Sequence, residues 1–220
     1  MKKSDFEQQL NDCDLLLREN NVADAVRLSG ELLSKADSDW RGRYNAGESR
    51  TDEICQVLDA GAMHCLALFL SGQIRDCYST AVMLDLECEV DGVDRRMVRL
   101  STLRLRHLAL TSFLSVLDSM PVSGDEEVLD HVSNIMRYLC DLLCHDYEGV
   151  VNGDVSDLSG ADRAVVSEVH GLLSGLLERG MRFEADAIVV GGEFHSPEHP
   201  AAVIGDLIGR SRALGLMAVD

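Results

Sequence analysis

Five arginines gather in one short segment of an otherwise acidic chain, and their spacing suits anion binding. The segment 94–107 reads DRRMVRLSTLRLRH, and no acidic residue follows Asp94 until Asp118. Helical spacing would place Arg95, Arg99 and Arg106 on one face. Guanidinium groups bind carboxylates and phosphates through paired hydrogen bonds, so this face is a candidate site for a phosphate or for a partner's acidic tail. The alternative is internal pairing with the acidic residues of 85–91 just upstream.

His107 ends the same segment and lies on its apolar side, four residues after Leu103 and three before Leu110. A histidine at such a position is ordinarily a core residue with satisfied hydrogen bonds. The functional alternative is a ligand contact inside a groove. The candidate binding residues are therefore Arg95, Arg99, Arg106 and His107.

Two cysteines and a histidine lie close enough in the sequence to be considered as zinc ligands. Cys140 and Cys144 are one helical turn apart, and His145 follows. A closed zinc site needs four ligands, and no C-x-x-C or second nearby pair supplies the others, so buried thiols are the favoured interpretation. His195 and His199 are also four apart, in a polar stretch that we expect to precede a capped helix. We therefore predict no metal site.

No motif supports a catalytic centre. The acidic stretch 146–162 lacks the order of carboxylates and glycine that a calcium loop requires. A glycine-rich phosphate loop, a nucleophile elbow and an HExxH pair are absent from the sequence. We therefore predict no catalytic residue and no cofactor, and we expect the protein not to be an enzyme.

Charge and cysteine content limit the partners and the compartment. A formal net charge of -18 argues against nucleic acid and against an anionic membrane surface. The longest apolar runs are shorter than the roughly 20 residues that span a bilayer. Acidic residues interrupt the start of the chain where a signal peptide would be apolar. Seven scattered cysteines, an odd number, are typical of reduced thiols, so we expect a cytoplasmic protein.

The elements that would position these residues are all helical. Apolar residues make up 46% of the chain but aromatic residues only 5%, and apolar positions recur at helical spacing, clearest in the hairpin 61–89. Two polar stretches, 37–50 and 146–160, are predicted to be loops. The expected elements are helix pairs over about 4–36, 51–89, 93–145 and 161–190 and a terminal helix over 197–217, about nine helices in all.

Three of the predicted turns share one register. At Asn20, Gly72 and Gly180 a pair of large apolar residues precedes the turn residue, an acid follows it by four and a small residue by five. Asn20 and Gly72 are 52 residues apart, and Gly180 lies 108 further on; an expected fourth turn near Gly124 matches poorly. We expect the turn residue to take a positive φ or to cap the helix, and the small residue to let two helices approach closely.

These turns resemble the tetratricopeptide repeat family, which has a glycine at the turn and a small residue five positions on. The closest matches are ENNVADAVRLSGELL and SGQIRDCYSTAVML, and ERGMRFEADAIVV is weaker. The unit of about 52 residues departs from the 34 of the family, and Cys13 and Cys65 stand where the family has a glycine. The resemblance implies stacked hairpins with a concave surface that binds peptides or proteins.

Together these features predict an all-α fold, a right-handed stack of antiparallel helix hairpins in a single domain over 1–220. The expected function is non-catalytic binding of a protein or peptide. One alternative is a small-ligand-binding regulatory or sensor domain that uses the Arg95–Arg106 face. The third alternative is an enzyme or a metal-binding protein.

Overall fold

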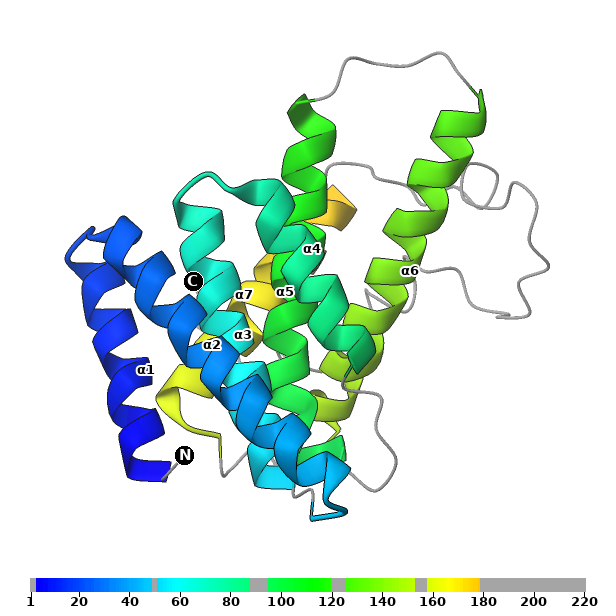
Figure 1. The fold of residues 1–220 in the computed structure, drawn as a ribbon. Helices are drawn as coiled ribbons and strands as arrows, with labels where there is room; N and C mark the ends of the chain where they lie inside the picture. Colours follow the sequence, from blue (N-terminus) through cyan, green and yellow to red (C-terminus); the bar gives the residue numbers. More distant parts are fainter. Residues whose placement is uncertain (1–2, 49–50, 88–94, 120–125, 153–157, 179–220) are drawn as a thin grey trace. The chain divides into compact units, whose positions relative to one another are not determined.

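The chain is all-helical throughout the residues that the structure, a computed structural model, describes (Figure 1). Those residues are 3–48, 51–87, 95–119, 126–152 and 158–178. They form seven helices and no strand, which confirms the all-α prediction. The helices are α1 (Lys3–Arg18), α2 (Val22–Asn45), α3 (Thr51–Leu70), α4 (Ile74–Glu87), α5 (Arg95–Ser119), α6 (Glu126–Val151) and α7 (Gly160–Glu178).

The chain divides into two compact units, Met1–Ser119 and Met120–Asp220. The first unit holds α1 to α5, and the second holds α6 and α7. The predicted helices at 182–190 and 197–217, and the predicted turn at Gly180, lie outside the described residues. The count of nine helices and the single domain over 1–220 therefore stay predictions.

Helix α3 is the centre of the first unit, because it contacts α1, α2, α4 and α5. Buried residues occur on most of its circumference, from Ile54 near its start to Leu68 near its end. Among the described helices, α3 is the one that is long and apolar enough to cross a membrane, and half of its apolar window is buried inside the fold. Contact with four neighbouring helices accounts for this apolar composition.

The contacts of the first unit follow a simple order along the chain. Each helix packs against the next, from α1 with α2 to α4 with α5, and Figure 1 shows α1 and α2 side by side. Alternate helices also meet, because α1 contacts α3 and α3 contacts α5. Within the first unit, α3 thus lies between α1 and α5, and α2 and α4 each pack against two of these three helices.

The turns after α1 and α3 have the same backbone geometry, 52 residues apart. Asn20 has a φ of 60° and Gly72 a φ of 79°, so the predicted positive φ is confirmed at both. In each turn, the N–H of the turn residue donates to the carbonyl three residues earlier. The N–H of the following residue donates to the carbonyl five residues before it, which is the Schellman pattern. These bonds are Asn20 to Leu17 (3.0 Å), Asn21 to Leu16 (2.8 Å), Gly72 to Phe69 (3.0 Å) and Gln73 to Leu68 (2.9 Å).

The small residues after these turns are buried between the helices of each pair, in line with the predicted close approach of the helices. Ala25 and Cys77, each five residues after its turn residue, are both 0% exposed. Their counterparts on the preceding helices, Cys13 and Cys65, are also 0% exposed. In each hairpin, one small or medium side chain from each helix therefore lies at the same level along the helix pair. Larger side chains at these positions would hold the two helices apart.

The predicted loop over 37–50 is wrong, because α2 continues to Asn45. Ala36 and Trp40 are buried at four-residue spacing and extend the apolar stripe that begins at Leu32. The polar residues of this stretch lie on the outer side of the helix, where Arg41 pairs with Asp37 at 2.8 Å. The residue that ends the helix is Gly47, whose φ is 73°, and not Gly42. The prediction failed because the many polar residues of this stretch hide the amphipathic pattern of α2.

Helix α6 also runs further than predicted, to Val151 instead of His145. Tyr147, Val150 and Val151 are buried and continue its inner face, so the start of the predicted loop over 146–160 is wrong. Residues 153–157 lie outside the described part of the chain. Ser159 then caps α7, because its hydroxyl oxygen accepts the backbone N–H of Asp162 at 3.2 Å.

A Gly42→Ala substitution tests the extended α2. A Cβ at position 42 meets nothing within 4 Å, so alanine removes the entropic cost of glycine in a helix without a clash. We expect the free energy of unfolding to rise by about 0.5–1 kcal/mol. Trp40, the only tryptophan of the chain, reports urea unfolding of the first unit by its fluorescence. An unchanged midpoint would mean that this stretch is not helical in solution.

Candidate functional site

Helix α5 distributes the predicted binding residues over two sides. It is continuous from Arg95 to Ser119, and successive residues are rotated by about 100°. Arg95, Arg99 and Arg106 therefore share one side, whereas His107 is turned away and shares a stripe with Arg104 and Thr111. The side chains of Arg95 and Arg99 lie outside the described part of the structure. A binding role for the four predicted residues stays a prediction.

His107 is half-buried, and this burial determines the protonation state of its imidazole. Loss of solvent lowers the pKa of its imidazole from 6.5 to about 4, because burial disfavours the protonated ring. The side chain is therefore neutral at pH 7, with one nitrogen able to donate a hydrogen bond and the other able to accept one. Arg104 and Arg106 are also half-buried, and both interact with other residues of the fold.

Contacts to α2 and α4 show which side of α3 faces these even-numbered helices. His64 meets Ser29 of α2 at 3.0 Å, and the Cys65 thiol donates to the Cys77 carbonyl of α4 at 3.7 Å. Half-buried residues form a stripe on the opposite side of α3, at a spacing of three, four and three residues. They are Gln56, Asp59, Met63 and Leu66.

Helix α5 carries a matching stripe. Ser112 donates a hydrogen bond to Cys77 of α4 at 3.1 Å, and Phe113 packs on Tyr78 of α4 with ring centroids 5.8 Å apart. The side turned away from α4 holds half-buried residues at the spacing found on α3. They are Arg104, His107, Thr111 and Leu114. We call these two stripes together the odd-helix face.

A hydrogen bond joins the two helices that carry this face. The hydroxyl of Ser101 on α5 donates to Oδ1 of Asp59 on α3 at 2.5 Å. Ser101 is 6% exposed, so this bond to a carboxylate is shielded from water. The odd-helix face thus combines a carboxylate, a guanidinium group and an imidazole with apolar side chains, a mixture that suits contact with a polypeptide.

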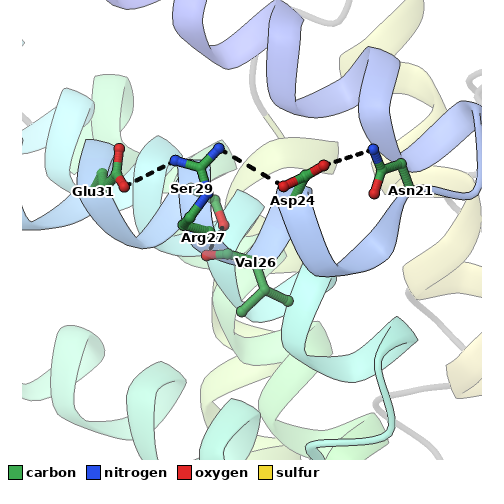
Figure 2. Close-up of polar contacts among 6 residues, drawn as sticks. All are labelled: Asn21, Asp24, Val26, Arg27, Ser29 and Glu31. Atoms are coloured by element: carbon green, nitrogen blue, oxygen red, sulfur yellow. Dashed lines mark hydrogen bonds and ion pairs between the residues drawn. The ribbon is translucent and has the colours of Figure 1, made fainter.

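A serine and a histidine also meet between α2 and α3. Ser29 is 0% exposed, and its hydroxyl donates to the Val26 carbonyl at 3.2 Å (Figure 2). Nδ1 of His64 lies 3.0 Å from the Ser29 hydroxyl oxygen. Burial lowers the pKa of His64, and a hydrogen bond to Val26 partly opposes that shift. A fully buried hydroxyl is out of reach of a substrate, so the pair links two helices.

The outer side of α2 is a contrasting surface. Figure 2 shows Asn21, Asp24, Arg27 and Glu31 following one another along the helix. Arg27 pairs with Glu31 at 3.0 Å and with Asp24 at 3.7 Å, and all three side chains are more than half exposed. Such solvated ion pairs contribute at most about 1 kcal/mol each to stability. This side of α2 is a polar, solvated surface.

The residues of the metal hypothesis do not form a cluster within the described part of the chain, where no three His, Cys, Asp or Glu side chains converge. Cys140 is buried, Cys144 is half-buried, and the His145 side chain is 68% exposed beside Asp146. Residues 146–151 are helical, so no calcium loop forms there. His195 and His199 lie outside the described residues.

A second buried histidine contact lies in the other unit. The Tyr147 hydroxyl of α6 lies 3.3 Å from Nδ1 of His170 on α7. Tyr147 is 0% exposed and His170 is 5% exposed. This contact connects the two described helices of that unit through polar groups in an apolar surrounding, where a satisfied pair favours one specific packing.

Comparison of the chain with protein-family models, with curated proteins and with solved structures found no match. The resemblance to tetratricopeptide repeats therefore rests on the turn motifs of the sequence.

The contacts between helices were not predicted from the sequence. Ser29, Ser101 and Ser112 are all buried. Their partners, His64, Asp59 and Cys77, are 35 to 42 residues away in the chain. A serine at a core position of an amphipathic helix signals that some partner exists. Identifying that partner requires the rotation of the facing helix, which periodicity does not provide.

Proposed function

We propose that the first unit is a tetratricopeptide-like stack of helix hairpins that binds a protein or peptide partner across the odd-helix face. The adjacency of α1, α3 and α5 is the observation that supports this proposal most directly. Adjacent parallel helices present their outward stripes as one continuous surface, the arrangement that repeat scaffolds use for extended ligands. Catalysis is not part of this proposal.

The composition of the two sides supports the choice of face. On α2 the exposed residues Asp24, Arg27 and Glu31 pair with one another, so these charges are already satisfied within the helix. On α3 the stripe contains Met63 and Leu66 beside Gln56, and all three are half-buried. Side chains that mix apolar and polar character are typical of binding surfaces. In this arrangement His107 contacts the partner, and Arg95, Arg99 and Arg106 flank the contact.

Affinity capture with matched variants tests the proposal. The test bait carries Gln56→Arg and Met63→Arg on the odd-helix face. The control bait carries Ser34→Arg and Ser38→Arg at exposed positions of α2, so both baits gain two positive charges. Proteins captured from a lysate of the source cells are compared by quantitative mass spectrometry, after circular dichroism has shown that all baits are folded.

We expect wild type and the α2 control to capture a common set of partners that the odd-helix variant loses by at least about tenfold, equivalent to 1.4 kcal/mol of binding. Equal capture by both variants would place the binding surface elsewhere. Failure of folded wild type to enrich any partner over an unrelated acidic bait would remove the support for a binding function.

A further inference from the structure

Two cysteines meet inside the second hairpin. Cys65 of α3 and Cys77 of α4 are each 0% exposed. The Cys65 thiol donates to the Cys77 carbonyl oxygen at 3.7 Å, so the side chain of Cys65 reaches Cys77 across the hairpin. The two cysteines are therefore neighbours in the interior of this helix pair.

A third residue distinguishes the two thiols. Ser112 of α5, also 0% exposed, donates its hydroxyl hydrogen to the Cys77 sulfur at 3.1 Å. Interaction with the Cys65 side chain lowers the pKa of the Cys77 thiol, burial opposes this shift, and the hydrogen bond from Ser112 lowers the pKa further. The pKa of Cys65 is raised well above its usual value, first by interaction with the Cys77 side chain and then by burial. Cys77 is thus the member that forms a thiolate and attacks.

The first hairpin contains only half of this arrangement. Cys13 occupies the position of Cys65 in the shared register, but Ala25 stands where the second hairpin has Cys77. Burial, with a smaller contribution from Asp12, raises the pKa of Cys13 to about 11. Cys13 is therefore an internal control, a thiol with equal burial and no cysteine at the partner position.

We propose that Cys65 and Cys77 form a reversible intrachain disulfide between α3 and α4 when the protein meets a small peroxide. This redox site is independent of the proposed binding function. The bond would join the two helices across the Gly72 turn and lock the hairpin. Because both sulfurs are buried, a small oxidant that enters through local opening suits the site better than a bulky disulfide.

The reaction balances in two steps. The Cys77 thiolate attacks one peroxide oxygen, an S–O bond forms and the O–O bond breaks. The released hydroxide takes up the proton that the thiol lost and becomes water. Cys65 then attacks the Cys77 sulfenic acid, so that an S–S bond forms and the S–O bond breaks, and the second hydroxide leaves as water with the Cys65 proton. The two thiols lose two electrons, and the peroxide is reduced to two waters.

Peptide mapping of the full-length native chain tests the proposal. The protein is treated with hydrogen peroxide, alkylated under denaturing conditions and digested with trypsin, which cleaves at Arg75 between the two cysteines. Cys55→Ser and Cys88→Ser in the background leave Cys65 and Cys77 as the only cysteines of peptides 51–75 and 76–95. We expect these peptides to be linked, with loss of two hydrogens, and to separate on reduction with dithiothreitol.

Three variants sharpen the result. Ser112→Ala should slow disulfide formation several-fold, because the donor to Cys77 is lost. Cys65→Ala should leave a Cys77 sulfenic acid that dimedone traps. Ala25→Cys should create the same link to Cys13 in the first hairpin. If Cys65 and Cys77 are both still alkylated at a peroxide dose that oxidises the half-buried Cys144, the proposal is overturned.

Discussion

A Gly72→Pro variant is expected to lose more than about 3 kcal/mol of the free energy of unfolding of the first unit. Gly72 has a φ of 79°, whereas the proline ring fixes φ near −65°. The substitution also removes the N–H that bonds the Phe69 carbonyl at 3.0 Å, and it disfavours a helical conformation at Ser71. Urea unfolding followed by Trp40 fluorescence measures the loss.

The equivalent turn of the first hairpin supplies a matched control. Asn20 has a φ of 60°, which glycine adopts at lower cost, so Asn20→Gly should leave stability unchanged or raise it by up to about 1 kcal/mol. Gly72→Asn should cost less than about 1 kcal/mol, because asparagine tolerates this conformation better than other side chains. A wild-type unfolding curve for Gly72→Pro would refute the turn geometry.

A Gly61→Leu variant should have the second-largest effect, a loss of about 3 kcal/mol. A Cβ at position 61 would lie 2.3 Å from Cδ1 of Leu84 on α4 and 3.8 Å from Cδ1 of Leu33 on α2. Leu84 is 7% exposed and is packed against its neighbours, so a full leucine at position 61 must push α4 away from α3. The urea midpoint by Trp40 fluorescence again gives the measurement.

Two companion experiments isolate this contact. Gly42→Leu inserts the same side chain at a helical glycine with open space around it, and it should not destabilise the protein. Gly61→Ala combined with Leu84→Ala should cost less than the sum of the single changes, with a coupling of about 0.5–3 kcal/mol. Additive effects, or equal losses at positions 42 and 61, would contradict the close approach of α3 and α4.

The turns that end α1 and α3 were predictable because local signals coincide there. Apolar spacing ends where a residue able to take a positive φ follows, as at Asn20 and Gly72. The end of α2 was missed because its inner stripe is sparse. Ala36 and Trp40 are the buried residues of that stretch, and Gly42 lies among charged residues without ending the helix. A single helical glycine and a terminal glycine differ in backbone conformation, which composition does not reveal.

The candidate site was predictable only in part. The helical register already implied that Arg95, Arg99 and Arg106 share a side of α5. Finding that the stripe of Arg104 and His107 is turned away from α4 required knowing which side of α5 packs on α4. The contacts of Ser112 and Phe113 with α4 provide that orientation. The link between Asp59 and Ser101 depends on the packing of α3 against α5, a tertiary feature that neither helix encodes alone.

Site-specific photo-crosslinking can show whether a partner binds the odd-helix face. A photoreactive amino acid is placed at position 63 or 107 on that face, or at position 34 on the solvated side of α2. After irradiation in a lysate of the source cells, crosslinked products are identified by mass spectrometry. We expect one common partner to be crosslinked from positions 63 and 107 but not from position 34. Crosslinks from position 34 alone, or from none of the three, would contradict it.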